Sequence, residues 1–548
     1  MKRRTLLKSA IATIPALAMK KAFGNAGNIL GDFDAGETMA SGRFTPDWDS
    51  LQHYKVPEWY RDAKFGIWAH WGPQCQPEHG DWYARSMYME GSDDYKYHVE
   101  KYGHPSKFGF KDVINEWKAE NWNPEQLVSL YKDAGAKYFF ALANHHDNFD
   151  NYNSRHQRWN STKIGPKKDL IAGWAKAAKN NDLKFGVSFH AAHAWMFYET
   201  AQSADKNGPL TGIPYDGNIT KQSGKNTRWD GYDPQELYSQ RHTPGLSGGA
   251  QWAWSHGASV PDEKYCEKFF NRTIDLINKY DPDMVYFDDT ILPLYPISDV
   301  GLRLTAHLYN TNIKKNKGSL EAVIFGKILN EQQRKCMVWD IERGQSNNIE
   351  PLPWQTDTCL GEWHYDRRIF ERKGYKTAKT IIHTLIDVVS KNGNLLLSVP
   401  VRGDGTIDSE EMAIVKGITA WNKRNGECIF GTRPWKIFGE GPASEVVNPL
   451  TAEGFNEGKG KPFTGSDFRF TTKGNLLYAI ALGLPPDGKA IVKSLALTSI
   501  HYSGQIADVK LVGYDHSLSY HRRSDALVIE LPNDLPQQEA YCFKIMPA

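Results

Sequence analysis

The 548-residue sequence predicts an α/β protein, in which a (β/α)8-type (TIM-like) barrel is followed by a C-terminal antiparallel β-sandwich. Three observations support this fold class. The chain is too long for one compact core, which favours two domains. Helical and strand patterns alternate from about residue 50 to 425. From about residue 434 the pattern changes to short alternating runs separated by turn residues, which indicates antiparallel strands.

Successive helix–strand pairs indicate the barrel. In residues 121–135, Asn123 is the expected N-cap, Pro124 takes the first helical position and Gly135 ends the helix. A buried strand is expected to follow at residues 137–144. Helices within 168–181, 267–282 and 378–394 precede apolar runs at 183–189, 284–289 and 395–401. This repetition is typical of a parallel sheet with crossover helices, and the length suits eight strands.

The sequence also predicts where the parts of the chain begin and end. We expect a signal peptide at 1–26, a catalytic barrel at 45–430 with an insertion at 196–260, and the β-sandwich at 431–548. The insertion is too long for a simple loop and is expected to lie over the active face. The expected sandwich strands are 468–472, 476–482, 492–497, 507–514, 526–532 and 540–546.

The N-terminus resembles a bacterial twin-arginine signal. Arg3 and Arg4 are followed by Thr-Leu-Leu-Lys and by an apolar run at residues 11–18 that is too short to span a bilayer. We expect export to the periplasm or the medium, with cleavage between Ala18 and Gly27. No other membrane span is expected.

Composition excludes several classes of protein. A net charge of +2 gives no reason to expect nucleic acid or acidic lipid as a partner. The six cysteines contain no CxxC pair, which argues against a zinc knuckle and a dense disulfide framework, although one or two disulfides remain open. The 18 Trp, 26 Tyr and 24 Phe residues can fill cores, and they can also stack on the apolar faces of sugars.

Polar residues follow several predicted strands, where the active site of a barrel forms. They are His70, His145, His146, His190, Asp288 and Asp289. The histidines have neither HxxxH nor HExxH spacing, and adjacent residues of a strand point to opposite faces, so a catalytic metal is disfavoured. The pattern favours hydrogen bonds to substrate hydroxyls over a structural role. No metal or other cofactor is expected.

Seven segments occur in an order that resembles the α-L-fucosidases of glycoside hydrolase family 29. The resemblance extends over roughly residues 50 to 425, and a β-sandwich follows the barrel in that family as it is expected to do here. The segments are KFGIWAHWGP, DWYARSMY, AKYFFALANHHDNF, RWNSTKIGPKKDL, LKFGVSFH, PDMVYFDD and SKNGNLLLSVPVRGDGTI.

The resemblance implies an exo-acting, retaining hydrolase that releases α-L-fucose from fucose-containing oligosaccharides or polysaccharide fragments. Asp288 takes the position of the family nucleophile, which forms a covalent glycosyl-aspartate, and Asp289 is the second choice. His190 and Tyr286 depart from the residues common in the family, and we expect them to bind substrate too. The full set of expected substrate-binding residues is His70, Trp71, Trp82, Tyr83, His145, His146, His190 and Tyr286.

The general acid departs from the family pattern, because Gln355 stands where the family has a glutamate. Glutamine cannot donate a proton as an acid. We therefore assign the acid/base to Glu342, with Glu350 as the alternative. Three interpretations remain open: an α-L-fucosidase, a hydrolase of the related α-L-galactosides, and a carbohydrate-binding protein that has lost its acid. A pocket built for a methyl group rejects an added hydroxyl only weakly, by about a hundredfold.

Overall fold

The computed structural model describes residues 36–245, 254, 258–445 and 454–548. The predicted signal peptide lies outside the described residues, so export stays a prediction. Within the described residues, no helix combines the length and apolar character needed to cross a bilayer.

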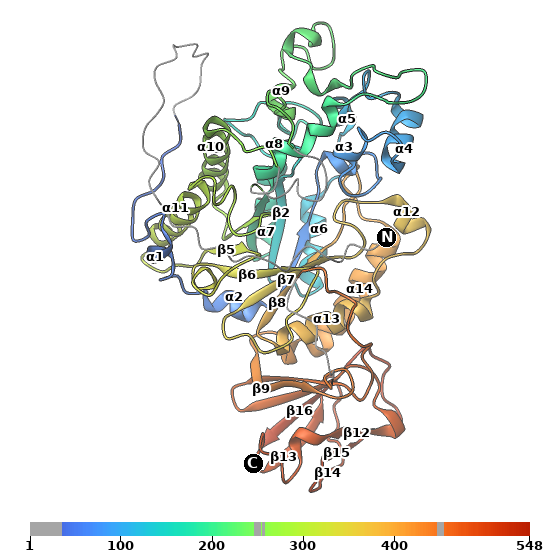
Figure 1. Ribbon diagram of the computed structural model, residues 1–548. Helices are drawn as coiled ribbons and strands as arrows, with labels where there is room; N and C mark the ends of the chain where they lie inside the picture. The colour runs from blue at the N-terminus through green and yellow to red at the C-terminus, as the bar shows by residue number, and fades with distance from the viewer. Residues whose placement is uncertain (1–35, 246–253, 255–257, 446–453) are drawn as a thin grey trace. The chain divides into compact units, whose positions relative to one another are not determined.

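Eight parallel strands close into a barrel, which confirms the predicted fold class (Figure 1). The first strand pairs with both the second and the eighth, so the barrel has no free edge. The strands are β1 (Phe65–Ala69), β2 (Tyr138–Asn144), β3 (Lys184–Phe189), β4 (Met284–Phe287), β5 (Val323–Gly326), β6 (Val338–Glu342), β7 (Trp354–Cys359) and β8 (Gly393–Ser398).

Helices connect the strands, and several of them begin at side-chain caps. Asn123 accepts a 3.1 Å hydrogen bond from the Gln126 backbone N–H, as the sequence predicts, and Asp169 caps the next long helix in the same way. The longer helices are α4 (Asp93–Tyr102), α6 (Pro124–Asp133), α7 (Leu170–Asn180), α10 (Glu263–Tyr280), α11 (Val300–Lys315), α13 (Ala378–Ser390) and α14 (Ser409–Asn425). The shorter ones are α1 (Trp48–Leu51), α2 (Glu58–Ala63), α3 (Tyr83–Ser86), α5 (Phe110–Glu116), α8 (Ala194–Phe197), α9 (Gln235–Tyr238) and α12 (Arg367–Glu371).

Aromatic side chains fill the barrel interior. A Cβ at Gly66 would lie 2.1 Å from the Tyr138 ring, and one at Gly186 would lie 2.5 Å from the Phe140 ring. Glycine at these two positions therefore makes room for the rings, because a core has little free volume. Gln355, which stands where the family resemblance implies a glutamate, is buried in this interior. Its side-chain oxygen accepts from the hydroxyls of Tyr60 and Tyr138, at 3.0 and 3.2 Å.

The described part of the predicted insertion consists of short helical turns tied to the barrel loops by buried polar groups. Asp216 accepts from the hydroxyls of Tyr88 and Tyr238, at 2.7 and 2.8 Å. The Lys111 ammonium of α5 also lies 2.7 Å from Asp216. At the start of the insertion, the Phe197 ring packs 5.7 Å from the ring of His146, so this segment reaches the predicted site.

The C-terminal part contains a five-stranded sheet, β13-β16-β11-β10-β9, and a three-stranded sheet, β12-β15-β14. The predicted strand at 492–497 is wrong, because β12 ends at Val492 and Lys493–Leu495 form a 3-10 turn. Strands β9 and β14 were not predicted. The bounds are β9 (Arg433–Glu440), β10 (Phe468–Lys473), β11 (Leu476–Ala481), β12 (Lys489–Val492), β13 (Ile506–Leu511), β14 (Tyr520–Arg522), β15 (Leu527–Glu530) and β16 (Tyr541–Pro547).

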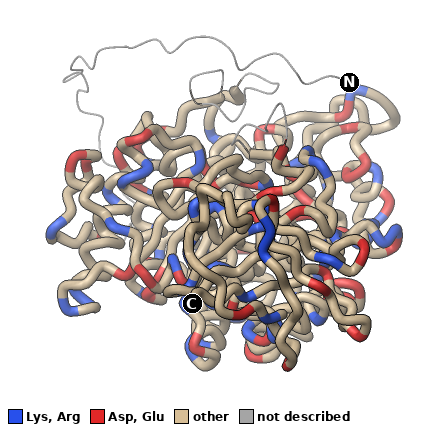
Figure 2. Tube along the Cα trace, turned by 90° about the horizontal axis from the view of Figure 1, so that it is seen from below, with Lys and Arg blue, Asp and Glu red and all other residues tan. Residues whose placement is uncertain are grey.

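Charge and cysteine state agree with the composition. Lys and Arg are interspersed with Asp and Glu over the view in Figure 2, as a net charge of +2 suggests. All six cysteines are buried, and each is a free thiol in the structure. Some buried charges occur as partnered sets. Asp387 of α13, for example, lies 2.6 Å from both Lys391 and Arg469, and the second contact ties α13 to β10.

Candidate active site

The predicted histidines converge beyond the carboxyl ends of β1, β2 and β3. Ring centroids lie 4.5 Å apart for His145 and His146, 5.1 Å for His70 and His145, and 5.2 Å for His70 and His190. The expectation that adjacent histidines point to opposite faces is wrong here. Strand β2 ends at Asn144, so the alternation of a strand does not extend to this pair.

Asp288, the first residue after β4, faces this cluster. One carboxylate oxygen, Oδ2, lies 3.1 Å from His146 Nε2 and 3.4 Å from His190 Nδ1. The other, Oδ1, accepts a 2.5 Å bond from Lys327 Nζ. Burial alone would raise the pKa of Asp288, but the Lys327 charge and the two imidazoles outweigh it and hold the pKa well below the ordinary value. Asp288 is therefore an anion at neutral pH.

Asp289, the alternative nucleophile, forms hydrogen bonds with the backbone of its own loop. Its oxygens accept from the backbone N–H groups of Thr290 at 2.7 Å and Leu294 at 3.2 Å. Its side chain is 2% exposed, whereas that of Asp288 is 28% exposed. The geometry favours Asp288 as the carboxylate that can meet a substrate.

Glu342, the last residue of β6, lies opposite Asp288 across Lys327. Glu342 Oε2 and Asp288 Oδ1 are each 2.5 Å from the same Lys327 nitrogen. The two carboxylate oxygens therefore lie no more than twice that distance, 5.0 Å, apart. Lys327 carries the charge that pairs with both. Burial would lower its pKa, but the two carboxylates raise the pKa well above its ordinary value.

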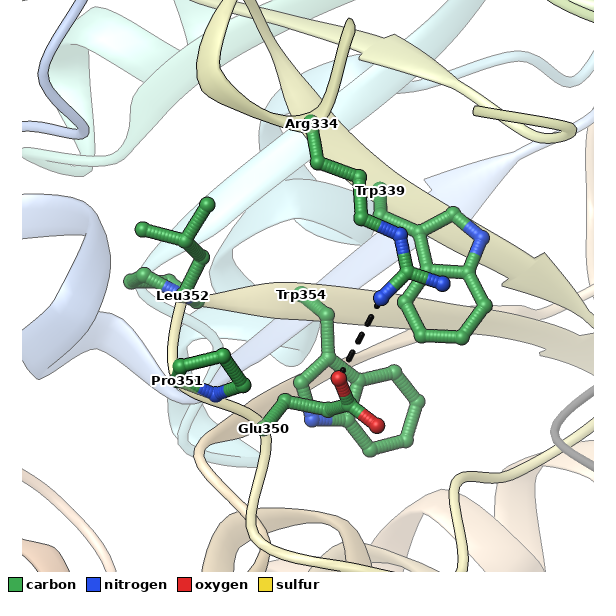
Figure 3. A pocket seen from close by; sticks show the side chains of 7 residues that line it. Arg334, Trp339, Glu350, Pro351, Leu352 and Trp354 are labelled. Atoms are coloured by element: carbon green, nitrogen blue, oxygen red, sulfur yellow. Dashed lines mark hydrogen bonds and ion pairs between the residues drawn. The ribbon is translucent and has the colours of Figure 1, made fainter. Parts of the chain in front are cut away.

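Glu350, the alternative acid, lies at the other end of the barrel. Its backbone N–H donates to the Lys391 carbonyl, just before β8 begins, and its carboxylate lies 3.3 Å from Arg334, which precedes β6. Figure 3 shows Glu350 paired with Arg334 in a shallow pocket between the rings of Trp339 and Trp354. These contacts are at the amino ends of the strands, so Glu350 does not share the site of Asp288.

Of the remaining predicted binding residues, two lie at or below the histidine cluster and two pack away from it. The Trp82 ring lies 6.2 Å from that of His146, at the cluster. Tyr286 lies beneath it, inside the barrel, where its hydroxyl donates to Asp357 at 2.8 Å. Trp71 and Tyr83 are instead fully buried. Trp71 packs among other tryptophans and donates to the Arg402 carbonyl at 2.8 Å, and Tyr83 bonds His98 at 2.7 Å.

Two site residues escaped the sequence prediction. Lys327 directly follows β5, and the rule applied to the other strand ends would have found it. His364 lies in the loop after β7, with its ring 4.7 Å from that of His70 and 4.6 Å from that of His145. His364 Nδ1 lies 3.0 Å from an Asp81 carboxylate oxygen, so this nitrogen carries a hydrogen.

The cluster can receive a polyhydroxylated ligand. Burial, reinforced by neighbouring imidazoles, lowers the pKa values of His70 and His145 well below the ordinary value, and that of His190 to about 4. The three rings are therefore neutral at pH 7. Several buried nitrogens have no protein partner among the described residues, and a buried nitrogen without a partner is costly unless a ligand supplies one. They are Trp68 Nε1, His70 Nδ1 and Nε2, His190 Nε2 and His364 Nε2.

Two overlapping sets of side chains also have ligand atoms close enough to be considered for a metal. They are His70, His145 and His190, and His146, His190 and Asp288, with ligand atoms within 4.8 Å of one another. We expect no metal requirement, because the family resemblance implies a retaining glycosidase, and such an enzyme needs only its carboxyl groups. Prolonged chelation should leave hydrolysis unchanged. Stoichiometric zinc or calcium in the purified protein, with activity lost on its removal, would contradict this prediction.

Comparison with known proteins identifies the family. The α-L-fucosidase family model matches residues 33–427, and the model of the α-L-fucosidase C-terminal domain matches residues 461–546. This chain belongs to the α-L-fucosidase family. It is a fucosidase-type glycoside hydrolase, as the order of its motifs predicts.

Sequence relatives and solved structures match most of the chain. Rat tissue α-L-fucosidase is 25% identical over 84% of each chain, and the human tissue enzyme is 24% identical over 92% of each. A Thermotoga maritima α-fucosidase in complex with a mechanism-based inhibitor superposes with a TM-score of 0.67 at 24% identity, covering 92% of this chain and 100% of that one. The structural match shows the shared fold.

Proposed function

We propose that this fucosidase hydrolyses terminal α-L-fucosides with retention of configuration, with Asp288 as nucleophile and Glu342 as acid/base. The observation that carries the proposal is the spacing of the two carboxylates. Their oxygens lie no more than 5.0 Å apart. Retaining glycosidases hold their carboxyl groups about 5–5.5 Å apart, whereas inverting enzymes leave about 6.5–9.5 Å for a water molecule.

The residues support a two-step reaction. The ionised Asp288 attacks the anomeric carbon while Glu342, in the role of general acid, gives a proton to the departing oxygen. The bond from Asp288 to the sugar forms as the glycosidic bond breaks. Glu342 then takes a proton from water, which attacks the same carbon and releases Asp288 as a carboxylate. The neutral histidines hold the sugar hydroxyls during both steps.

The stereochemistry tests this proposal directly. Proton NMR during hydrolysis of an aryl α-L-fucoside should show α-L-fucose as the first product, with the β anomer appearing later by mutarotation. β-L-Fucose as the first product would refute the double displacement. The same assay with an aryl α-L-galactoside addresses the related substrate, because a single added hydroxyl is only weakly rejected by an apolar pocket.

The histidine pair is expected to hold the sugar. His145→Ala or His146→Ala leaves a hydroxyl or a buried polar group without a partner, which costs about 1–3 kcal/mol. The expected loss in kcat/KM is about ten- to a hundredfold, in a protein that still folds by circular dichroism. Unchanged kinetics in a folded variant would assign the pair a structural role.

Lys327 is expected to set the acid limb of the pH profile. Its charge helps to hold the pKa of Asp288 well below the ordinary value of 3.8, so in the native enzyme protonation of Asp288 limits the rate only in strong acid. Lys327→Met removes that charge and raises the Asp288 pKa, so kcat/KM should begin to fall about one pH unit higher or more. Lys184→Met, which removes the surface pair with Asp283, is the control. An unchanged acid limb in Lys327→Met would contradict the assignment.

A further inference from the structure

A short segment between strands β9 and β10 is anchored beside Glu342. The segment, Gly454–Glu457, runs along residues 342–345, which begin at the end of β6. Phe455 N–H donates to the Glu342 carbonyl at 2.8 Å, and Glu457 N–H donates to the Arg343 carbonyl at 2.9 Å. Asn456 accepts from the Gln345 N–H at 3.0 Å and donates to its carbonyl at 3.2 Å.

Charged groups fix this segment to the mouth of the barrel. The Glu457 carboxylate accepts from the Thr358 hydroxyl of β7 at 2.9 Å and lies 2.8 Å from Lys376 and 3.6 Å from Arg343. The Asn456 side chain is buried. A segment tied to the ends of both β6 and β7 keeps its position relative to Glu342.

Phe455 differs from its neighbours in being exposed. Its side chain is 58% exposed, and its φ of +59° lies in the left-handed region that residues with a Cβ seldom adopt. The bonds at Glu342 and Glu457 hold the backbone in this conformation. The result is a large aromatic side chain presented to solvent next to the acid/base residue. An aromatic ring of this kind can stack on the apolar face of a sugar, as aromatics do on other ring systems.

The position of Glu342 determines which part of a substrate lies nearby. A general acid touches the leaving oxygen, so the groups beside it lie on the side of the departing sugar. We propose that Phe455 forms the binding platform for the leaving sugar of a fucosylated oligosaccharide, with Asn456 and Glu457 as positioning residues. This inference rests on the proposed function, because it requires Glu342 to act as the acid.

The test compares a substrate that has a leaving sugar with one that has none. For the first substrate, the native enzyme is assayed on the 1→2, 1→3, 1→4 and 1→6 linked fucosyl disaccharides, and the one that it cleaves fastest is used. The second substrate is α-L-fucosyl fluoride. Phe455→Ala should lower kcat/KM for the disaccharide by about tenfold, equivalent to about 1.4 kcal/mol, and leave the fluoride within about twofold. Phe455→Trp should retain the disaccharide activity.

Two further variants serve as controls. Leu497→Ala removes a side chain that is 61% exposed in the C-terminal part, and it should change neither substrate. Glu457→Gln weakens the anchor and should reproduce the selective loss on the disaccharide. The platform would be refuted if Phe455→Ala lowered kcat/KM equally for both substrates or for neither. It would also be refuted if the native enzyme cleaved no disaccharide. A native enzyme that fails to hydrolyse the fluoride would instead overturn the proposed function.

Discussion

Asp288→Gly is expected to lose nearly all turnover on every α-L-fucoside, by about 10⁴-fold or more in kcat, because no covalent intermediate can form. The backbone position should tolerate the change, since Asp288 lies after β4 and is the more exposed of the two adjacent aspartates. Added azide should restore part of the rate by attacking the anomeric carbon from the vacated side. The product should then be the β-fucosyl azide, of inverted configuration.

The neighbouring aspartate supplies the control for this prediction. Asp289→Asn retains one oxygen, which can accept from either the Thr290 or the Leu294 backbone N–H, so it should fold and keep a substantial part of the activity. If Asp289 proves indispensable and Asp288 does not, the assignment of the nucleophile is off by one residue. Azide rescue of Asp289→Asn with inversion would lead to the same conclusion.

Glu342→Ala is expected to show a loss that depends on the leaving group. A nitrophenol departs without much protonation, so kcat on the nitrophenyl fucoside should fall by no more than about tenfold. A fucosyl disaccharide, whose sugar alcohol needs the proton, should lose about 10²–10⁴-fold. Added azide should accelerate the variant by attacking the glycosyl-enzyme, and the product should be the α-fucosyl azide, of retained configuration.

Glu350→Ala is the matched control, because it removes a glutamate that pairs with Arg334 at the opposite end of the barrel. It should affect both substrates alike and only slightly. Leaving-group dependence in Glu350→Ala, with none in Glu342→Ala, would transfer the acid role to Glu350. Equal loss of Glu342→Ala on both substrates would show that Glu342 supports structure and does not transfer a proton.

The sequence predicted the part of the site that follows apolar strands. His70, His145, His190 and Asp288 each come directly or nearly so after a buried run, and parallel strands bring their carboxyl ends together. The spacing of the histidines was less informative. The side chains of His145 and His146 converge because β2 ends at Asn144. The alternation of residues in the sequence does not show where a strand ends.

Other parts of the site lacked a readable signal. Strand β7 buries Gln355, Thr356, Asp357 and Thr358, so its polar sequence does not resemble a central strand, and the loop carrying His364 was not placed. Gln355 itself suggested a lost acid, whereas it accepts from two tyrosines inside the barrel. Its position shows that this substitution alters the barrel interior. The carboxylates of Asp288 and Glu342 still lie together on Lys327.

Two aromatic residues were expected to bind substrate only because they adjoin other predicted site residues, and the structure places them elsewhere. Trp71 follows His70, yet its ring lies 5.1 Å from that of Trp117 in the packing between barrel and helices. Tyr83 follows Trp82 but begins helix α3 and bonds His98. Adjacent residues in a loop can face different surroundings. A binding role inferred from a neighbour therefore needs the structure to support it.

The central claim is that Asp288 forms a covalent bond to the sugar. A 2-deoxy-2-fluoro-α-L-fucosyl fluoride should inactivate the native enzyme, because the 2-fluorine slows turnover of the intermediate while fluoride leaves readily. Peptide mapping by mass spectrometry should then find the fluorofucosyl group on Asp288, and the Asp288→Gly variant should remain unlabelled. A label on Asp289 or on another carboxylate, or turnover without any labelled peptide, would contradict the mechanism.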